Sequence, residues 1–394
     1  MSSLHKQIDA ITEFLRPFSA FINCHMVNYL TDNHWEHFIS SEVREEIDNF
    51  EEAIECFKKL QNFIKSCRNL YLENSKNITS SIEDVILNIS EGNLLKKSND
   101  DLSIKEFMSA KKCHEVEVAS KFIHEILSLA PVDCVIDAGD GKGYLSSRLA
   151  LQYKLKVLGI DASTSNTENA LDRKKKLEKA WNGLTERANL LSQGITPPRR
   201  GKKAKATEIQ ETRPENYKTC NEFITKDVNF QKLAGEAFNG EFQSFCMTGL
   251  HTCGNLASTC LKVFQNQDDF KVLCNVGCCY HLINEEFSQD EFFGNKVLRN
   301  LNKDFGFPLS GYLKGQKIQL GRNARMLAAQ SVHRTLDKKE LPDKSLFYRA
   351  LLEVLIVGMN ENLKDTVQVG KIKNESGTFW NMSRNVTKRR VWDF

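Results

Sequence analysis

Three glycines on alternate positions, Gly139, Gly141 and Gly143, lie within residues 135–150, VIDAGDGKGYLSSRLA. They follow a short apolar run that contains Asp137, and a helical pattern begins directly after them. Glycine lets the backbone adopt positive φ angles and approach a ligand closely. In open α/β sheets, ligands bind beyond the carboxyl ends of the strands, often where the first strand turns into its helix. The spacing therefore predicts a ligand-binding turn.

Two common nucleotide-binding motifs do not fit this loop. A P-loop requires G-x-x-x-x-G-K-[ST], whereas Lys142 is followed by Gly143. A dinucleotide fingerprint requires G-x-G-x-x-G, and its last glycine is replaced by Tyr144. The loop is therefore neither a P-loop nor a good dinucleotide fingerprint.

Segments of strand length alternate with helical patterns from residue 108 onward. The candidate strands are VDCVIDA, LKVLGID, NEFITKD, QSFCMTG and FKVLCNVG. Strands that alternate with helices predict parallel βαβ units in an α/β sheet. Residues 108–300 are therefore predicted to form one α/β domain, with a basic insertion at about residues 163–215.

The two flanking regions are predicted to be helical. Residues 1–107 form an N-terminal domain, because HKQIDAITEFLRPFSAFI repeats apolar residues every three or four positions. Residues 301–394 form an irregular helical C-terminal extension. Within it, LGRNARMLAAQ places Arg322 and Arg325 three positions apart. This spacing suits phosphate recognition, and it equally suits salt bridges to the acidic N-terminal domain.

Charge is distributed unevenly along the chain. Residues 1–107 carry 11 basic and 18 acidic side chains, so the rest of the chain carries 43 and 33. Residues 173–205 alone hold eleven basic and two acidic side chains. A basic surface beside a site favours an anionic substrate such as RNA. A solvated helix face followed by a loop is an equally good interpretation.

The overall composition is that of a globular protein outside the secretory pathway. The chain has 394 residues, of which 41% are hydrophobic and 27% charged. LLEVLIVGM is far shorter than the roughly 20 apolar residues that a membrane span needs. The N-terminus lacks a secretory pattern, and twelve cysteines in such a chain predict reduced thiols. We expect a cytoplasmic or nuclear protein that does not enter a membrane.

Several motifs together resemble the methyltransferase-like protein 25 family. They are D-x-G-x-G-x-G from Asp137, MSAKKCHEV, GKGYLSSRL, H-T-C-G, G-C-C-Y and LGRNARMLAAQ. The resemblance covers roughly residues 108–330 and extends more loosely to both ends. A more distant likeness links the H-x-C-G and C-C pairs to a transfer RNA ribose methyltransferase family. The resemblance implies a Rossmann-like class I methyltransferase sheet with S-adenosylmethionine as cofactor.

The resemblance also implies roles at the cofactor site. Asp137 would face the cationic amino and sulfonium groups, Asp161 would accept from the ribose hydroxyls, and Asp227 would accept from the adenine amino group. The candidate cofactor-binding residues are Asp137, Gly139, Gly141, Gly143, Tyr144, Asp161 and Asp227.

The chain departs from the family pattern at three places. Asp140 stands where a small residue such as serine is usual, and we expect its carboxylate to weaken the site by lying near the cofactor's own carboxylate. Asn255 stands where aspartate is usual. The C-terminus does not resemble that of the family, and no sixth and seventh strands can be placed after Asn284.

Methyl transfer requires positioning and, for some acceptors, a base. In the class I strand order the fourth and fifth strands are neighbours, so their ends bring His251 and Cys253 to the Cys278–His281 segment. We name His251, Cys253 and Tyr280 as candidate catalytic residues, with His251 as a base and Tyr280 stacking on or orienting the acceptor. A structural histidine that holds the Cys-Gly turn is the alternative for His251.

Zinc is a competing interpretation of the same cysteines. Cys253, Cys278, Cys279 and His281 are all possible ligands. However, the C-x-x-C spacing of structural sites is absent, and adjacent cysteines are awkward joint ligands. The sequence therefore predicts no metal.

The leading functional hypothesis is an S-adenosylmethionine-dependent methyltransferase whose acceptor is RNA or a translation-associated protein. The alternative is a non-catalytic binding or scaffold protein that retains the methyltransferase fold. Asp140 and the unusual C-terminus motivate this alternative.

Overall fold

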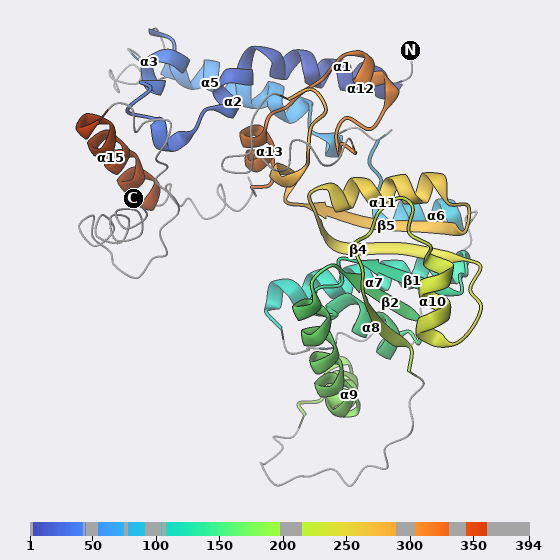
Figure 1. Ribbon diagram of the computed structural model, residues 1–394. Helices are drawn as coiled ribbons and strands as arrows, with labels where there is room; N and C mark the ends of the chain where they lie inside the picture. Colours follow the sequence, from blue (N-terminus) through green and yellow to red (C-terminus); the bar gives the residue numbers. More distant parts are fainter. Residues whose placement is uncertain are drawn as a thin grey trace. The chain divides into compact units, whose positions relative to one another are not determined.

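The computed structural model describes residues 3–41, 44, 54–74, 78–90, 104, 108–197, 215–288, 304–330 and 344–360. The chain divides into two compact units (Figure 1). One unit is Ser80–Gln319, and the other combines Met1–Thr79 with Leu320–Phe394. The domain boundaries predicted at residues 107 and 300 lie outside the described residues and stay predictions.

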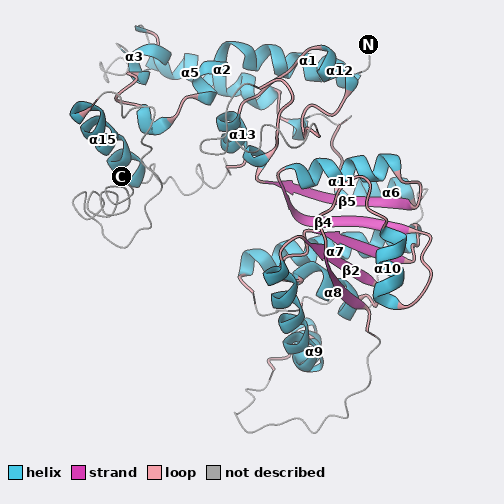
Figure 2. Ribbon diagram, in the orientation of Figure 1, coloured by secondary structure: helices cyan, strands magenta, loops and turns pink. Residues whose placement is uncertain are grey.

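The unit Ser80–Gln319 is built on a five-stranded sheet in the order β3-β2-β1-β4-β5 (Figure 2). Every pair of neighbouring strands is parallel. The strands are β1 Cys134–Ala138, β2 Val157–Asp161, β3 Tyr217–Asn221, β4 Phe245–Cys253 and β5 Phe270–Cys278. The strand order reverses between β1 and β4, which is where open α/β sheets bind ligands. The predicted Rossmann-like sheet is confirmed.

Helices cover both faces of this sheet. They are α6 Ile82–Ile89, α7 Ala110–Leu129, α8 Tyr144–Gln152, α9 Thr164–Ser192, α10 Phe230–Phe238 and α11 Asn255–Asn266. Ile136 and Ala138 of β1 pack with α10 and α11. Val135, one position away on the other face, packs with α7 and α8. Alternate residues of β1 therefore enter two different cores, as in a parallel sheet buried on both sides.

The chain after β5 docks back onto α11. Ser258 Oγ donates to the Gly306 carbonyl at 2.7 Å, and Asn255 Oδ1 accepts from the Asn284 N–H at 2.8 Å. Asparagine thus supplies at position 255 the oxygen acceptor that an aspartate would supply. The described part of this unit ends with the short helix α12 Gly311–Gly315 and contains no sixth or seventh strand.

The second unit is helical where it is described, as predicted for both ends of the chain. Its helices are α1 Ser3–Leu15, α2 Ser19–Asn23, α3 His34–Phe38, α5 Ile54–Asn69, α13 Arg322–Ala328 and α15 Lys344–Met359. Asn23 joins α2 to α13, because its Nδ2 donates to the Leu320 carbonyl and its Oδ1 accepts from the Ala324 N–H. Arg325 is buried, which disfavours phosphate recognition by this side chain. Among the described helices of the whole chain, none has the length and apolar character to cross a membrane.

Candidate active site

The glycine loop follows β1 and adopts the backbone that its sequence predicts. Gly139, Gly141 and Gly143 have φ angles of +73°, +58° and +66°, a region that residues with a side chain rarely enter. The Gly141 N–H donates to Asp161 Oδ2 at 3.0 Å. The loop is therefore tied to the carboxyl end of the neighbouring strand β2.

Asp161 is half-buried and oriented by three hydrogen bonds. Its Oδ2 accepts from Gly141, and its Oδ1 accepts from the Ser163 N–H at 2.8 Å and from Asn166 Nδ2 at 3.1 Å. A carboxylate offers about four acceptor positions. One position on Oδ2 is thus available to a ligand hydroxyl, and a second hydroxyl would have to replace Asn166.

Asp140 points into the protein and not toward the open side of the loop. Its side chain is only 7% exposed. Its Oδ1 lies 2.6 Å from Ser146 Oγ, and its Oδ2 accepts from the Tyr217 hydroxyl. The carboxylate lies over Gly159, where any side chain would collide with it. The expectation that Asp140 lies near the cofactor's carboxylate is therefore corrected, because Ser146, Tyr217 and the space at Gly159 hold it inside.

Asp137 is also buried and shares Ser146 with Asp140. Ser146 Oγ lies 2.8 Å from Asp137 Oδ2. Burial, followed by the charge of Asp140, raises the pKa of Asp137 well above 3.8, and burial raises the pKa of Asp140 to about 6. Ser146 has one hydroxyl proton and can donate it to only one of the two carboxylates. The structure does not bring Asp137 to the open side of the loop, and its role toward a cofactor stays a prediction.

Tyr144, the first residue of α8, lies between two cations. The Arg173 guanidinium is 4.3 Å and the Lys112 ammonium 4.7 Å from the centre of its ring. Cations over an aromatic ring attract it electrostatically. Tyr144 therefore ties the start of α8 to α9 and α7, next to the glycine loop.

Asp227 is not brought to the glycine loop. It is exposed and lines a surface pocket together with residues 267–269. Those residues directly precede β5 and so lie near the amino ends of the strands, opposite the loop. This placement gives no support to the predicted contact with adenine.

Two residues at and just after the end of β3 were missed by the sequence interpretation. Asn221, the last residue of β3, donates through Nδ2 to the Asp161 carbonyl at 2.9 Å. Phe223 follows it with 66% of its surface exposed. The residue between them, Glu222, donates its backbone N–H to the Asp161 carbonyl at 3.2 Å. The signal was the strand position, since β3 ends at Asn221 and not at Asp227.

The ends of β4 and β5 carry the predicted catalytic residues. The register between β4 and β5 shifts between Gly249 and Thr252, and His251 in this bulge has a φ of +137°. Bulges re-aim side chains and are frequent next to active sites. His251 Nε2 lies 3.3 Å from Glu115 Oε2 of α7, with 47% of the His251 side chain exposed. Glu115, part of the MSAKKCHEV motif, orients the imidazole ring, a role that the sequence did not reveal.

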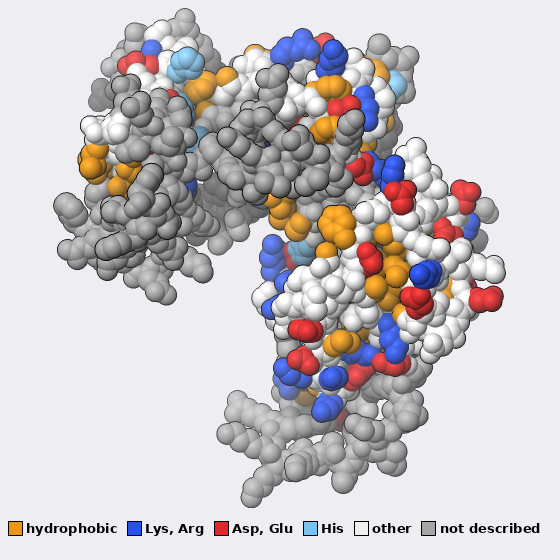
Figure 3. Space-filling view, viewed as in Figure 1, with side chains coloured by type: hydrophobic (Ala, Val, Ile, Leu, Met, Phe, Trp, Pro, Cys, Tyr) orange, Lys and Arg blue, Asp and Glu red, His pale blue; other side chains and the backbone are white. Residues whose placement is uncertain are grey.

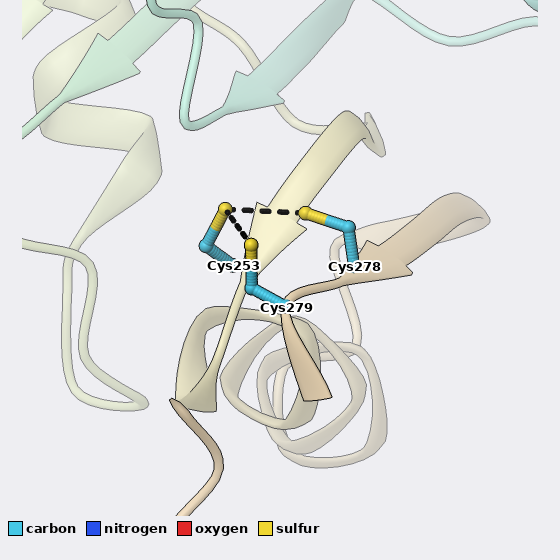
Figure 4. Close-up of side chains that lie close together, drawn as sticks. All are labelled: Cys253, Cys278 and Cys279. Atoms are coloured by element: carbon cyan, nitrogen blue, oxygen red, sulfur yellow. Dashed lines mark hydrogen bonds between the residues drawn. The ribbon is translucent and has the colours of Figure 1, made fainter. Parts of the chain in front are cut away.

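The remaining candidates lie just beyond His251. The Tyr280 ring packs over Gly277 and is 40% exposed. Cys253 Sγ lies 3.1 Å from Cys278 Sγ and 3.5 Å from Cys279 Sγ (Figure 4). Burial raises the pKa of Cys253, so it is a thiol at neutral pH. This disfavours Cys253 as a base or nucleophile, since the thiolate is the reactive form.

Comparisons with known proteins decide the class of the protein. Residues 111–286 match the family model described as a methyltransferase domain. The chain contains a methyltransferase domain. No solved structure matches the chain significantly.

Two mammalian relatives match nearly the whole of this chain. It is 27% identical to the mouse protein named probable methyltransferase-like protein 25, over 99% of the chain and 83% of that relative. It is 26% identical to the human protein of the same name, over 99% of the chain and 84% of the relative. The resemblance predicted from the motifs is confirmed.

Within the methyltransferase domain, the candidate residues other than Asp227 form two groups at the carboxyl edge of the sheet. The glycine loop and Asp161 follow β1 and β2, whereas His251 and Cys253 lie at the end of β4. Because β1 and β4 are neighbours, a ligand on the loop lies beside the end of β4.

Proposed function

We propose that the chain binds S-adenosylmethionine over the glycine loop and transfers its methyl group to an acceptor at the ends of β4 and β5. The observation that carries this proposal is the hydrogen bond from the Gly141 N–H to Asp161. This hydrogen bond holds the backbone of the glycine loop in place beside the Asp161 carboxylate, which still has one acceptor position. The methyltransferase domain supports the same choice of cofactor, since such domains generally use it.

Each residue of the proposed site has a distinct part in the proposed reaction. The loop backbone lies against the amino-acid part of the cofactor, Asp161 accepts from a ribose hydroxyl, and Phe223 packs against adenine. S-adenosylmethionine itself supplies the electrophilic methyl group. His251 accepts the acceptor's proton through Nδ1, because its Nε2 is directed at Glu115.

RNA is the acceptor that we favour over a translation-associated protein. The helix α9 exposes four basic side chains, Lys175, Lys176, Lys179 and Arg187. Lys and Arg side chains lie over this helix together with acidic ones (Figure 3). Basic side chains beside a site attract a phosphate backbone. We place the reaction in the cytoplasm or nucleus, because twelve cysteines in a chain without a secretory pattern predict reduced thiols.

Calorimetric titration with S-adenosylmethionine tests the cofactor site. Asp161→Asn places an NH₂ donor where Asp161 accepts from Gly141 and the ribose. A hydrogen bond to a charged group contributes about 1.5–3 kcal/mol, so we expect an affinity loss of about tenfold or more. Asp133→Asn is the matched control. Asp133 also accepts backbone hydrogen bonds, from Gln243 and Ser244 at the opposite end of β1, and its replacement should leave the affinity unchanged.

Incubation with methyl-labelled cofactor and cell extract tests the transfer. Label that ribonuclease releases supports RNA as the acceptor, whereas label that only protease releases identifies a protein acceptor. Cofactor binding without any transfer would favour the non-catalytic scaffold. Equal affinity of the wild type and Asp161→Asn would show that the ribose does not lie at Asp161.

A further inference from the structure

Three cysteine side chains converge beyond the ends of β4 and β5; we call Cys253, Cys278 and Cys279 the cysteine cluster. Cys253 and Cys278 are partners in the register of the two strands. The three sulfur atoms all lie within 4.8 Å of one another. Figure 4 shows the sulfurs turned toward one another at the strand ends. All three residues are free cysteines.

The spacing of the sulfurs matches a single metal ion. Thiolates bind zinc at about 2.3 Å, so two thiolates of a tetrahedral site lie about 3.8 Å apart. The observed separations are 3.1 Å and 3.5 Å from Cys253, with the third no longer than 4.8 Å. An ion equidistant from the three sulfurs therefore fits with small side-chain rotations. A disulfide would require about 2.05 Å between two sulfurs, about one ångström less than the shortest separation.

The backbone explains how two adjacent cysteines reach the same point. Cys279 has a φ of +45°, a left-handed conformation that is uncommon for residues other than glycine. This turn directs Cys279 Sγ to the side of Cys278 on which Cys253 lies. Gly254, which follows Cys253, packs directly against Leu282, and a side chain at 254 would collide with it. The two strand ends are thus held together, and adjacency does not prevent joint ligation here.

We propose that the cysteine cluster binds one Zn²⁺ through three thiolates and leaves a fourth coordination position open. Three sulfur ligands select zinc or copper(I) over magnesium and calcium. Zinc accepts three protein ligands with one exchangeable ligand. Cys253 is exposed, so solvent or a bound acceptor can supply the fourth ligand. Binding releases the thiol protons to solvent. This site replaces the expectation, drawn from sequence spacing, that the protein holds no metal.

Metal analysis of the full chain, purified under reducing conditions, tests the site. We expect about one zinc per chain by plasma mass spectrometry. Cys253→Ser, Cys278→Ser and Cys279→Ser should each lower zinc affinity by about a hundredfold or more, measured by competition with a chromophoric chelator. Loss of a group that merely supports a ligand already costs 10–100-fold. Cys113→Ser, at a half-buried free cysteine of α7, should retain the zinc.

A second measurement needs no variant and so does not depend on how the variants fold. The wild type is alkylated with iodoacetamide with and without added zinc, and each cysteine is quantified by peptide mass spectrometry. Zinc should protect the cysteine cluster at least about tenfold and leave Cys113 unaffected. Absence of both zinc and protection would overturn the proposal. So would copper in place of zinc, or a Cys253–Cys278 disulfide in the reduced preparation. Neither readout depends on methyl transfer, so this proposal can fail or succeed separately from the proposed function.

Discussion

Replacing Asp140 with asparagine should change how the stability of the methyltransferase domain depends on pH. The carboxyl group is buried, and burial raises its pKa from 3.8 to about 6. Between these values the folded state holds a proton that the unfolded state releases. The free energy of unfolding therefore falls as the pH rises from about 4 to about 6. A rise of roughly two pKa units at 1.36 kcal/mol per unit gives a loss of about 3 kcal/mol.

The asparagine variant lacks this loss because an amide does not ionise. Its oxygen can still accept from Ser146, and its NH₂ group can donate to the Tyr217 hydroxyl oxygen. Relative to the wild type, the variant should gain about 3 kcal/mol in free energy of unfolding between about pH 4 and pH 7.5. Asp137 remains in both proteins, and in the variant the charge of Asp140 no longer contributes to the raised pKa of Asp137.

Urea unfolding followed by circular dichroism at several pH values measures this gain. Asp133→Asn is a control for which the change in the free energy of unfolding should have the opposite sign. Hydrogen bonds from the Gln243 backbone and the Ser244 side chain lower the pKa of Asp133, so its stabilisation is present at neutral pH and lost as the pH falls through that lowered pKa. Its replacement should therefore destabilise the protein most at neutral pH. Parallel pH profiles for the wild type and Asp140→Asn would refute the buried position of Asp140.

Three further variants test the site, and two of them have a control variant. Gly143→Ala should destabilise the protein by about 1–2 kcal/mol in urea unfolding, since φ is +66° and the new Cβ meets the Tyr217 hydroxyl. Its control is Gly194→Ala, where φ is +74° and the space around the residue is open. This control should show the cost of backbone strain alone. His251→Asn should lower single-turnover methylation by about a hundredfold while cofactor affinity changes less than about twofold, and full turnover would leave it a structural residue. Phe223→Ala should weaken calorimetric cofactor binding and Asp227→Ala should not; the reverse order would place adenine near Asp227.

The sheet was predictable wherever an apolar run ended in a polar or glycine-containing turn. β1, β2, β4 and β5 all lie within or overlap the segments expected to be strands. β3 was predicted too late, at NEFITKD, because the true strand, YKTCN, is an edge strand in which only Tyr217 is buried and so lacks an apolar run. The predicted strand therefore ended at Asp227, whereas β3 ends at Asn221.

The direction of charged side chains could not be predicted from spacing. Asp140 follows the glycine loop pattern closely, yet it turns inward because Tyr217 and the empty space at Gly159 receive it. Both partners come from other strands of the sheet. The contact of Glu115 with His251 likewise joins α7 to the β4 bulge. Local sequence specified the loop backbone, whereas packing between distant segments decided which carboxylates face the site.

Because the strands have unequal lengths, the proposed cofactor site and the proposed zinc site lie apart in space. β4 and β5 have nine residues each, whereas β1 has five. Ala138, the last residue of β1, lies beside Gly249 of β4, because a side chain at position 249 would collide with the Ala138 carbonyl. At up to about 3.3 Å per residue, and less across the bulge between Gly249 and Thr252, His251 lies at most roughly 7 Å and Cys253 at most roughly 13 Å beyond the end of β1. A cofactor on the glycine loop would therefore lie nearer to His251 than to the cysteine cluster at the ends of β4 and β5.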